Sequence, residues 1–278
     1  MKQMFKSEYS VQTEGENKKI LLLSDIHYCN EKEKNYLQEV LDDVSTLEYD
    51  YLCISGDLLD KGKVEDISWL VNWLTSLGKL SKVIIGIGNH EQASDARKHE
   101  YAFDKALYNK INKIKNVRVL DNEAYVDGNI RFIGITLPLD YYYKYKENRS
   151  YFVKYINHTF PNPYKGKYNI LLCHTPIPFL DCSIASQLPL FSNVSLILCG
   201  HMHGGLLPRC LWRIGRGRGI IGPFHRIFPR GSYGMFYSGK SLVIVSSGIT
   251  KISQVHFLSF FNFLFRREIT MISLQSKK

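Results

Sequence analysis

The sequence predicts an α/β protein in which strands of a largely parallel sheet alternate with helices. Short apolar runs of strand length recur along the chain, and the segments between the first of them carry apolar residues at helical spacing. The 278 residues are 45% hydrophobic and 22% charged, which is ordinary for a globular protein. No repeat or linker divides the chain. We therefore expect one domain over 1–278, with a core over about 19–278 and an N-terminal extension or edge strand over 1–18.

The first half of the chain repeats a strand, a polar tip and a helix. The predicted strands lie at 19–27, 51–55 and 82–87, and the predicted helices at 31–47 and 64–80. The strands close on Asp25 and His27, on Asp57, and on Asn89. Alternate residues of a strand point to the same side, so Asp25 and His27 can face one ion. In parallel sheets the carboxyl ends of the strands carry the site.

The second half supplies further strands and one tyrosine-rich stretch. We predict a helix at 94–114, a hairpin turn at Asp127-Gly128, and strands at 117–120, 123–126, 130–135, 168–173, 196–199, 242–245 and 269–274. His174 follows one of these strands, and His201 and His203 follow the next. The stretch 140–163 could be a partly exposed aromatic helix or a lid that faces the substrate.

Five predicted strand ends carry side chains that could bind a metal ion. These are Asp25 with His27, Asp57, Asn89, His174, and His201 with His203. Any one of them alone is weak support, because turn carboxylates and ordinary histidines are commoner than ligands. Five such ends in one alternating chain together predict a metal centre.

The order of these motifs resembles a known family. D-x-H, G-D-x-x-D, G-N-H-E, H and G-H-x-H follow one another over about 19–205, as in the calcineurin-like metallophosphoesterase superfamily. The Gly-Gly pair after the last histidine, Ser246-Ser-Gly248 and Glu268-Ile-Thr270 resemble its small bacterial phosphodiesterase-like branch. The resemblance implies a four-layer α/β/β/α sandwich with two mixed β-sheets and a dinuclear metal site at the strand ends.

The resemblance also implies roles for individual residues. It implies one metal held by Asp25, His27 and His203, a second held by Asn89, His174 and His201, and Asp57 bridging both. His90 would be the general acid, and a hydroxide bridging the metals would attack phosphorus. Such mixed nitrogen and oxygen donors suit two divalent ions of Mn, Fe, Zn or Ni, of which we favour Mn. Asp60 and Glu91 would either orient histidines and backbone or simply cap turns.

Three positions depart from the family pattern. Cys29, Met202 and Leu206 stand where relatives often have glycine, threonine and glutamine. None of the three removes a ligand, although Leu206 could alter the substrate pocket.

We expect a metal-dependent phosphoesterase that hydrolyses a phosphodiester or pyrophosphate, on a lipid-linked or nucleotide substrate. One alternative is a phosphomonoesterase. The other is a catalytically weak module that binds anions or membranes through the basic segment Arg209–Arg230. A binding module gains nothing from a general acid, and this argues for the enzyme.

The net charge of +10 and the pI near 9.2 favour anionic partners. The basic segment could contact substrate phosphates or an anionic membrane surface, or it could be an ordinary solvated loop. The phenylalanine-rich run 257–265, followed by Arg266 and Arg267, suits either shallow membrane insertion or a buried loop and strand. Nucleic acid is a less expected partner.

Targeting and cysteine signals indicate the cytoplasm. The sequence has no secretory apolar core near its start and no apolar run of bilayer-spanning length. Its six cysteines include no CxxC pair, which favours reduced thiols. We therefore expect a cytoplasmic location, with any membrane association at the surface.

Overall fold

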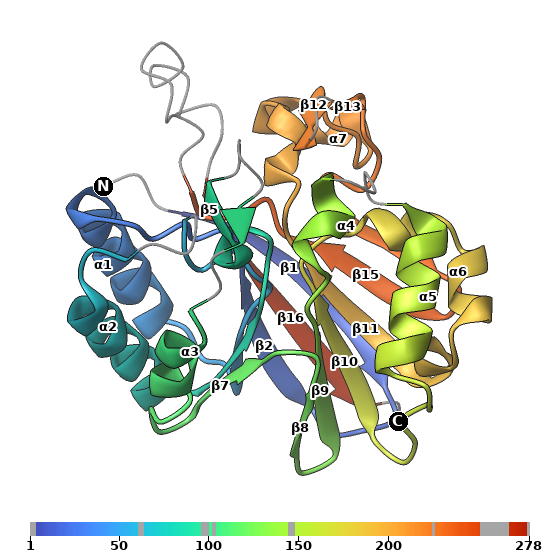
Figure 1. Cartoon of the computed structure of the whole chain (residues 1–278), viewed down its shortest axis with the longest axis horizontal. Coiled ribbons are helices and arrows are strands. Elements are labelled where there is room, and N and C mark those ends of the chain that lie inside the picture. Colours follow the sequence, from blue (N-terminus) through green and yellow to red (C-terminus); the bar gives the residue numbers. More distant parts are fainter. Residues whose placement is uncertain are drawn as a thin grey trace.

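The computed structural model describes residues 4–60, 64–95, 100–101, 104–143, 148–223, 226–250 and 267–276. Two six-stranded sheets pack face to face in it, and helices cover the outer face of each (Figure 1). Each sheet contains both parallel and antiparallel neighbours. The expected four-layer α/β/β/α sandwich is therefore confirmed.

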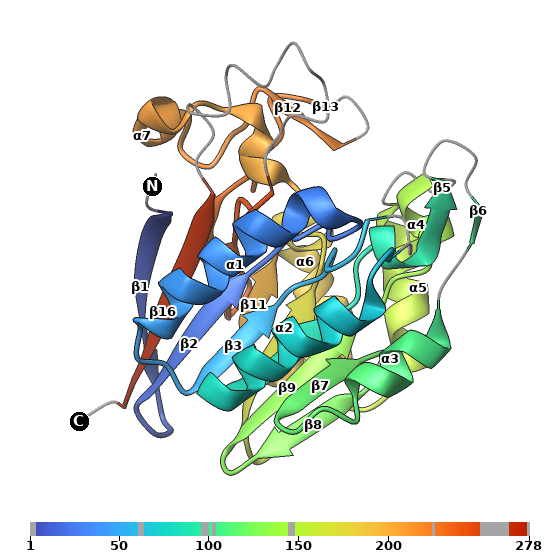
Figure 2. The ribbon, with the colours of Figure 1, turned by 90° about the vertical axis from the view of Figure 1, so that its left-hand side faces the viewer.

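The first sheet contains the strands of the first half of the chain and both terminal strands. Its order is β1 (Phe5–Thr13), β16 (Glu268–Ser276), β2 (Lys18–Leu23), β3 (Tyr51–Ile54), β4 (Lys82–Gly86) and β7 (Val117–Leu120). β16 runs antiparallel to β2, and the other neighbours are parallel. β1 is the outermost strand of this sheet. Figure 2 shows α1 (Glu31–Ser45), α2 (Ile67–Leu80) and α3 (Lys105–Ile111) on the outer face.

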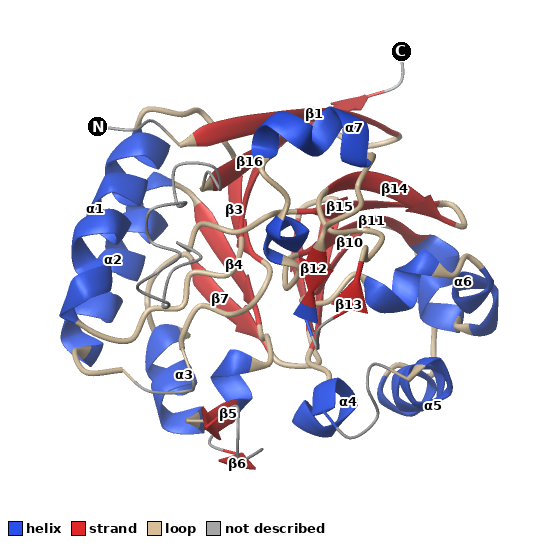
Figure 3. Cartoon of the chain, turned by 90° about the horizontal axis from the view of Figure 1, so that it is seen from above, coloured by secondary structure: helices blue, strands red, loops and turns tan. Residues whose placement is uncertain are grey.

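The second sheet is built from the second half of the chain. Its order is β14 (Gly234–Ser238), β15 (Ser241–Val245), β11 (Val194–Cys199), β10 (Tyr168–Cys173), β9 (Ile130–Ile135) and β8 (Ala124–Asp127). Its two edge strands are antiparallel to their neighbours, and the inner pairs are parallel. The outer face packs on α5 (Arg149–Thr159) and α6 (Ser183–Gln187), as the view from above shows (Figure 3).

The inner strands are apolar on both faces because both faces are buried. In β2, Leu21 and Leu23 pack with the helices, while Ile20 and Leu22 pack between the two sheets. Strand residues that face opposite ways are therefore equally hydrophobic, as is usual for parallel strands covered on both sides. This arrangement brings the carboxyl ends of the parallel strands of both sheets to one end of the molecule.

The prediction of one helix over 94–114 was wrong. Ala93–Asp95 forms the short strand β5, which pairs with β6 (Glu100–Tyr101), and α3 is the helix among the residues of this span that the structure describes. The Asp104 side chain accepts a hydrogen bond from Leu107 N at 2.9 Å and so fixes the start of α3. A capping aspartate inside an apolar pattern thus sets a boundary that periodicity alone does not reveal.

Short segments complete the end of the sheets where the parallel strands finish. The tyrosine-rich stretch forms α4 (Leu139–Tyr143) and α5, and buries Tyr141 and Tyr142 instead of exposing them. Between β11 and β14 lie η4 (His203–Leu206), η5 (Arg209–Leu211), α7 (Trp212–Gly215), β12 (Ile221–Gly222) and β13 (Arg226–Ile227). The remaining short helices are η1 (His90–Gln92), η2 (Ile177–Leu180) and η3 (Pro189–Asn193). Within the described residues, no helix has the length and apolar character needed to span a bilayer.

Candidate metal centre

The predicted ligands lie on loops that directly follow strands of both sheets. The loops after β2 and β3 are joined by backbone hydrogen bonds, including Ile26 N to Asp57 O at 2.7 Å and Tyr28 N to Leu58 O at 2.9 Å. In the second sheet, Gly200 N donates to His174 O at 2.8 Å. These bonds hold neighbouring loops in a fixed register, so the side chains that they carry converge.

Five of the predicted ligands have left-handed backbone conformations. Their φ angles are 52° at Asp25, 50° at His27, 53° at Asp57, 70° at His201 and 46° at His203. A non-glycine residue in this region is strained by roughly 1–3 kcal/mol, and such residues cluster at functional sites. Our explanation for the pairing of Asp25 and His27 was wrong, because β2 ends at Leu23. Left-handed turns, and not strand alternation, bring the two side chains together.

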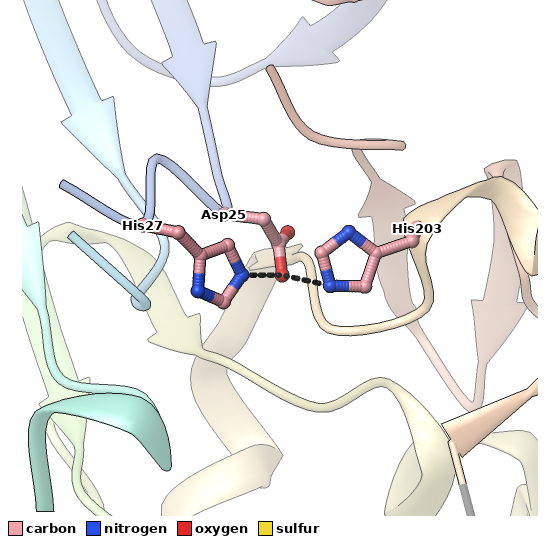
Figure 4. Close-up of side chains that lie close together, drawn as sticks. All are labelled: Asp25, His27 and His203. Atoms are coloured by element: carbon pink, nitrogen blue, oxygen red, sulfur yellow. Dashed lines mark ion pairs between the residues drawn. The ribbon is translucent and has the colours of Figure 1, made fainter. Parts of the chain in front are cut away.

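The first group of side chains consists of Asp25, His27 and His203 (Figure 4). One donor atom from each lies within 4.8 Å of the others. Oδ1 of Asp25 is 3.9 Å from Nε2 of His27 and 3.5 Å from Nε2 of His203. These three residues are the ones that the resemblance assigned to one metal.

The second group consists of Asp57, His174 and His201, again with donor atoms within 4.8 Å. Oδ2 of Asp57 is 2.9 Å from Nε2 of His174 and 3.7 Å from Nε2 of His27, so this carboxylate lies between the two groups. Nδ1 of His174 is 3.0 Å from Ser55 O, which turns Nε2 of the same ring toward Asp57. Asp57 is thus placed where the resemblance puts a bridging ligand.

The donor chemistry of these residues fits two divalent cations. Nε2 of His27 and Oδ1 of Asn89 are buried and have no hydrogen-bond partner among the described residues, as expected of atoms that bind an ion. Burial lowers the pKa of His27 to about 3, so its imidazole is in the neutral form that metals bind. Burial opposes ionisation of Asp25 and Asp57, but the neighbouring histidines outweigh it and lower the pKa of both carboxyls.

Two motif glycines are required by close approach. A Cβ on Gly88 would lie 2.1 Å from Oδ1 of Asp57, and one on Gly200 would lie 1.6 Å from Oγ of Ser24 and 2.5 Å from Oδ2 of Asp25. Gly200 also precedes the His201 amide, which donates to both carboxylate oxygens of Asp25 at 3.1 Å. The glycines of G-N-H-E and G-H-x-H therefore make room for the two aspartates.

His90 lies beside both groups but is oriented by a separate carboxylate. Its Nδ1 is 2.9 Å from Oδ1 of Asp60, and its ring centroid is 4.4 Å from that of His27. Together with His27 and Asp57 it also forms a third group of donor atoms within 4.8 Å. Burial would lower the pKa of His90, but Asp57 and Asp60 outweigh it and raise that pKa. A protonated imidazole at this position can donate a proton.

Glu91 supports the loops from beneath the site. Its carboxylate accepts hydrogen bonds from Asp57 N at 3.0 Å, Leu59 N at 2.9 Å and Gly88 N at 2.6 Å. Glu91 therefore orients backbone, and Asp60 orients a histidine. For these two residues the orienting alternative describes the contacts better than a simple turn cap.

Sequence reasoning did not assign two tyrosines that adjoin the site. The ring of Tyr142 lies 5.3 Å from that of His201, and the Tyr143 hydroxyl has the Asn89 side chain as a hydrogen-bond partner. Both come from α4, in the stretch for which we had considered a lid. The only signal was a run of three tyrosines, which does not distinguish packing from a site.

Removing metal is expected to lower thermal stability. A cation present at about 100 times its Kd stabilises the folded state by about 2.7 kcal/mol, which for a chain of this size raises Tm by roughly 5–10 °C. We expect Tm, measured by differential scanning fluorimetry, to fall by that amount after chelation and to recover with Mn²⁺. An unchanged Tm, together with no retained metal by mass spectrometry, would contradict a metal centre at these residues.

Comparisons with known proteins identify the family of the chain. The model of the calcineurin-like phosphoesterase family matches residues 18–205. An uncharacterized metallophosphoesterase of Helicobacter pylori is 26% identical over 187 residues, which cover 67% of this chain and 45% of that protein. One from Campylobacter jejuni is 24% identical over 232 residues, covering 83% of this chain and 53% of that protein. The chain thus spans about half the length of these curated relatives.

Similarity to solved structures is more distant. A dimetal phosphatase from Danio rerio superposes with a TM-score of 0.40 at 11% identity, over 83% of this chain and 87% of that one. The family match covers more than half of the chain and includes every predicted ligand and His90. The chain therefore belongs to the calcineurin-like phosphoesterase family.

Proposed function

We propose that this chain is a metal-dependent phosphoesterase whose substrate is a phosphodiester or a pyrophosphate. The observation that carries the proposal is the pair of donor groups with the Asp57 carboxylate between them and His90 beside them. We assign Asp25, His27 and His203 to one divalent ion and Asn89, His174 and His201 to the other. Mixed nitrogen and oxygen donors suit Mn, Fe, Zn or Ni, and of these four we propose Mn.

Two bound divalent ions would supply the positive charge that holds a phosphoryl group. They would also lower the pKa of water, so that hydroxide is available to attack phosphorus. The residues of the chain do the rest. Asp57 and Asp25 offset part of the metal charge, and His174 is held in one orientation by Ser55 O. His90, aligned by Asp60, donates its proton to the oxygen that leaves with the departing alcohol or phosphate.

The preference for diesters rests on the resemblance of the Gly-Gly pair and the C-terminal motifs to a phosphodiesterase-like branch. We propose a lipid-linked or nucleotide phosphate as the substrate class, and we consider nucleic acid a less expected partner. The cytoplasm is the proposed compartment, on the basis of the cysteine pattern.

The direct test measures the hydrolysis of two esters by metal-stripped protein to which Mn²⁺, Fe²⁺, Zn²⁺ or Ni²⁺ is added back. We expect Mn²⁺ to restore hydrolysis of bis-p-nitrophenyl phosphate and to support p-nitrophenyl phosphate at least about tenfold less well in kcat/KM, because pocket contacts discriminate on this scale. Faster hydrolysis of the monoester would favour the phosphomonoesterase alternative. No metal-dependent hydrolysis of either ester would contradict the proposal for these substrates and favour the binding module.

A further inference from the structure

The segment between His203 and β14 forms a small layer over the end of the sheets that carries the candidate metal centre. We call residues 206–223 and 226–233 the arginine cap. Figures 1 and 2 show its elements α7, β12 and β13 above both sheets, at the end where the parallel strands finish. The cap begins three residues after His203, and Ile220 N donates to Gly205 O at 2.7 Å. It is therefore attached to the loop that carries two of the proposed ligands.

The arginine cap has its own internal packing and is fixed to the first sheet. The rings of Trp212 and Tyr233 stack with centroids 4.0 Å apart, and Nε1 of Trp212 donates to Leu207 O at 3.0 Å. The Arg209 guanidinium lies over the ring of Phe5 and 3.7 Å from the buried carboxylate of Glu268. The Arg209 side chain thus packs against the first sheet, and these contacts hold the cap in place.

The outer surface combines exposed arginines with exposed large apolar side chains. Arg213, Arg216, Arg218 and Arg230 are exposed, and none forms an ion pair with a residue that the structure describes. Ile214 is 78% exposed, Ile227 is 74% exposed and Phe228 is 62% exposed. Large apolar side chains are seldom so exposed at several positions of one short segment, and such exposure indicates an interaction surface.

The charge of this region has one sign only. The sequence contains no aspartate or glutamate from 182 to 267, so every formal side-chain charge of the cap is positive. A solvated basic loop would not need apolar side chains held outward, and a protein that binds only polyanions would not gain from them. Apolar side chains interleaved with arginines are the chemistry of an interfacial membrane anchor.

We propose that the arginine cap docks on an anionic lipid bilayer. Ile214, Ile227 and Phe228 enter the headgroup region, and the four exposed arginines contact lipid phosphates. The docked face adjoins the loop of His201 and His203, so the metal centre lies at the edge of the membrane. The substrate class follows: a phosphodiester or pyrophosphate carried on a lipid. This last step rests on the proposed function, whereas docking does not.

The test is co-sedimentation of the whole chain with vesicles of phosphatidylglycerol and phosphatidylcholine, or of phosphatidylcholine alone. We expect binding to the anionic vesicles only. Arg213→Gln with Arg218→Gln should weaken binding about 25-fold, because each basic residue near an anionic surface contributes roughly fivefold. The matched control, Lys113→Gln with Lys115→Gln, removes the same charge before β7, at the opposite end of the sheet, and should bind normally.

The apolar part is tested with Ile214→Ser and Ile227→Ser together. We expect binding to anionic vesicles to fall at least about tenfold, because apolar area no longer enters the interface. Binding to a single-stranded oligonucleotide should not change. Normal vesicle binding of this variant would overturn insertion. Equal loss in the lysine control, or arginine-dependent oligonucleotide binding without vesicle binding, would overturn membrane docking altogether.

The substrate class has a separate readout. Two hydrolysis rates are measured with Mn²⁺ present, one on a phosphodiester lipid in vesicles and one on bis-p-nitrophenyl phosphate. We expect the ratio of the first rate to the second to be lower in the arginine variant than in the wild type. An unchanged ratio would overturn the lipid substrate. A wild-type chain that is inactive on both esters but binds vesicles would contradict the proposed function and leave membrane docking standing.

Discussion

Asp57→Asn is expected to lower kcat/KM for bis-p-nitrophenyl phosphate by about 10³-fold or more. Asp57 is the carboxylate between the two donor groups, 2.9 Å from Nε2 of His174 and 3.7 Å from Nε2 of His27. Losing one preorganised electrostatic contact in an active site costs about 10²–10³-fold, and here two metal positions lose the same anion. Asparagine keeps the size of the side chain and tolerates the left-handed backbone at this position.

Metal content distinguishes this effect from misfolding. We expect the bound metal, measured by inductively coupled plasma mass spectrometry, to fall in the variant from about two ions per chain to one or fewer. The control is Asp66→Asn, which changes the same atoms at the N-cap of α2, where asparagine is an equally good cap. Full activity and two retained ions in Asp57→Asn would rule out the bridging role.

The fold was predictable where hydrophobic pattern alone decides the structure. Leu21 to Leu23 are buried on both sides of their strand, so the sequence shows a continuous apolar run. The same holds for Leu171 with Leu172 and for Leu196 to Leu198. Polar residues that directly follow such runs come together because parallel strands end at one edge. That rule was enough to gather all seven proposed ligands at one end of the fold.

The prediction from sequence failed where single side-chain contacts determine the local structure. Asp104 begins α3 by capping its first turn, inside a stretch predicted as one helix, and periodicity does not show that boundary. Asp25 and His27 meet through left-handed turns held by hydrogen bonds to the loop after β3, which is distant in sequence. Tyr143 reaches Asn89 only because α4 follows a strand of the other sheet. The Asp104 cap is a local contact that periodicity does not reveal, whereas the other two features depend on tertiary contacts that the local sequence does not encode.

His90→Gln is expected to reduce activity according to how basic the leaving group is. His90 has a raised pKa and is aligned by Asp60, as suits a proton donor. General acid catalysis contributes typically about 10²–10⁴-fold when the departing oxygen is a strong base. We therefore expect a loss of that size on diphenyl phosphate but of only about tenfold on bis-p-nitrophenyl phosphate, because p-nitrophenolate leaves readily without a proton.

Two further measurements distinguish a general-acid role of His90 from a metal-ligand role, which the geometry also allows. His90 also lies within 4.8 Å of donor atoms of His27 and Asp57, so it could be a metal ligand instead. A ligand role predicts equal losses on both esters and fewer bound ions in His90→Gln. An acid role predicts unequal losses with both ions retained. Asp60→Asn should then show the same preference for the better leaving group with a smaller loss, because Asp60 acts through His90 and touches no substrate.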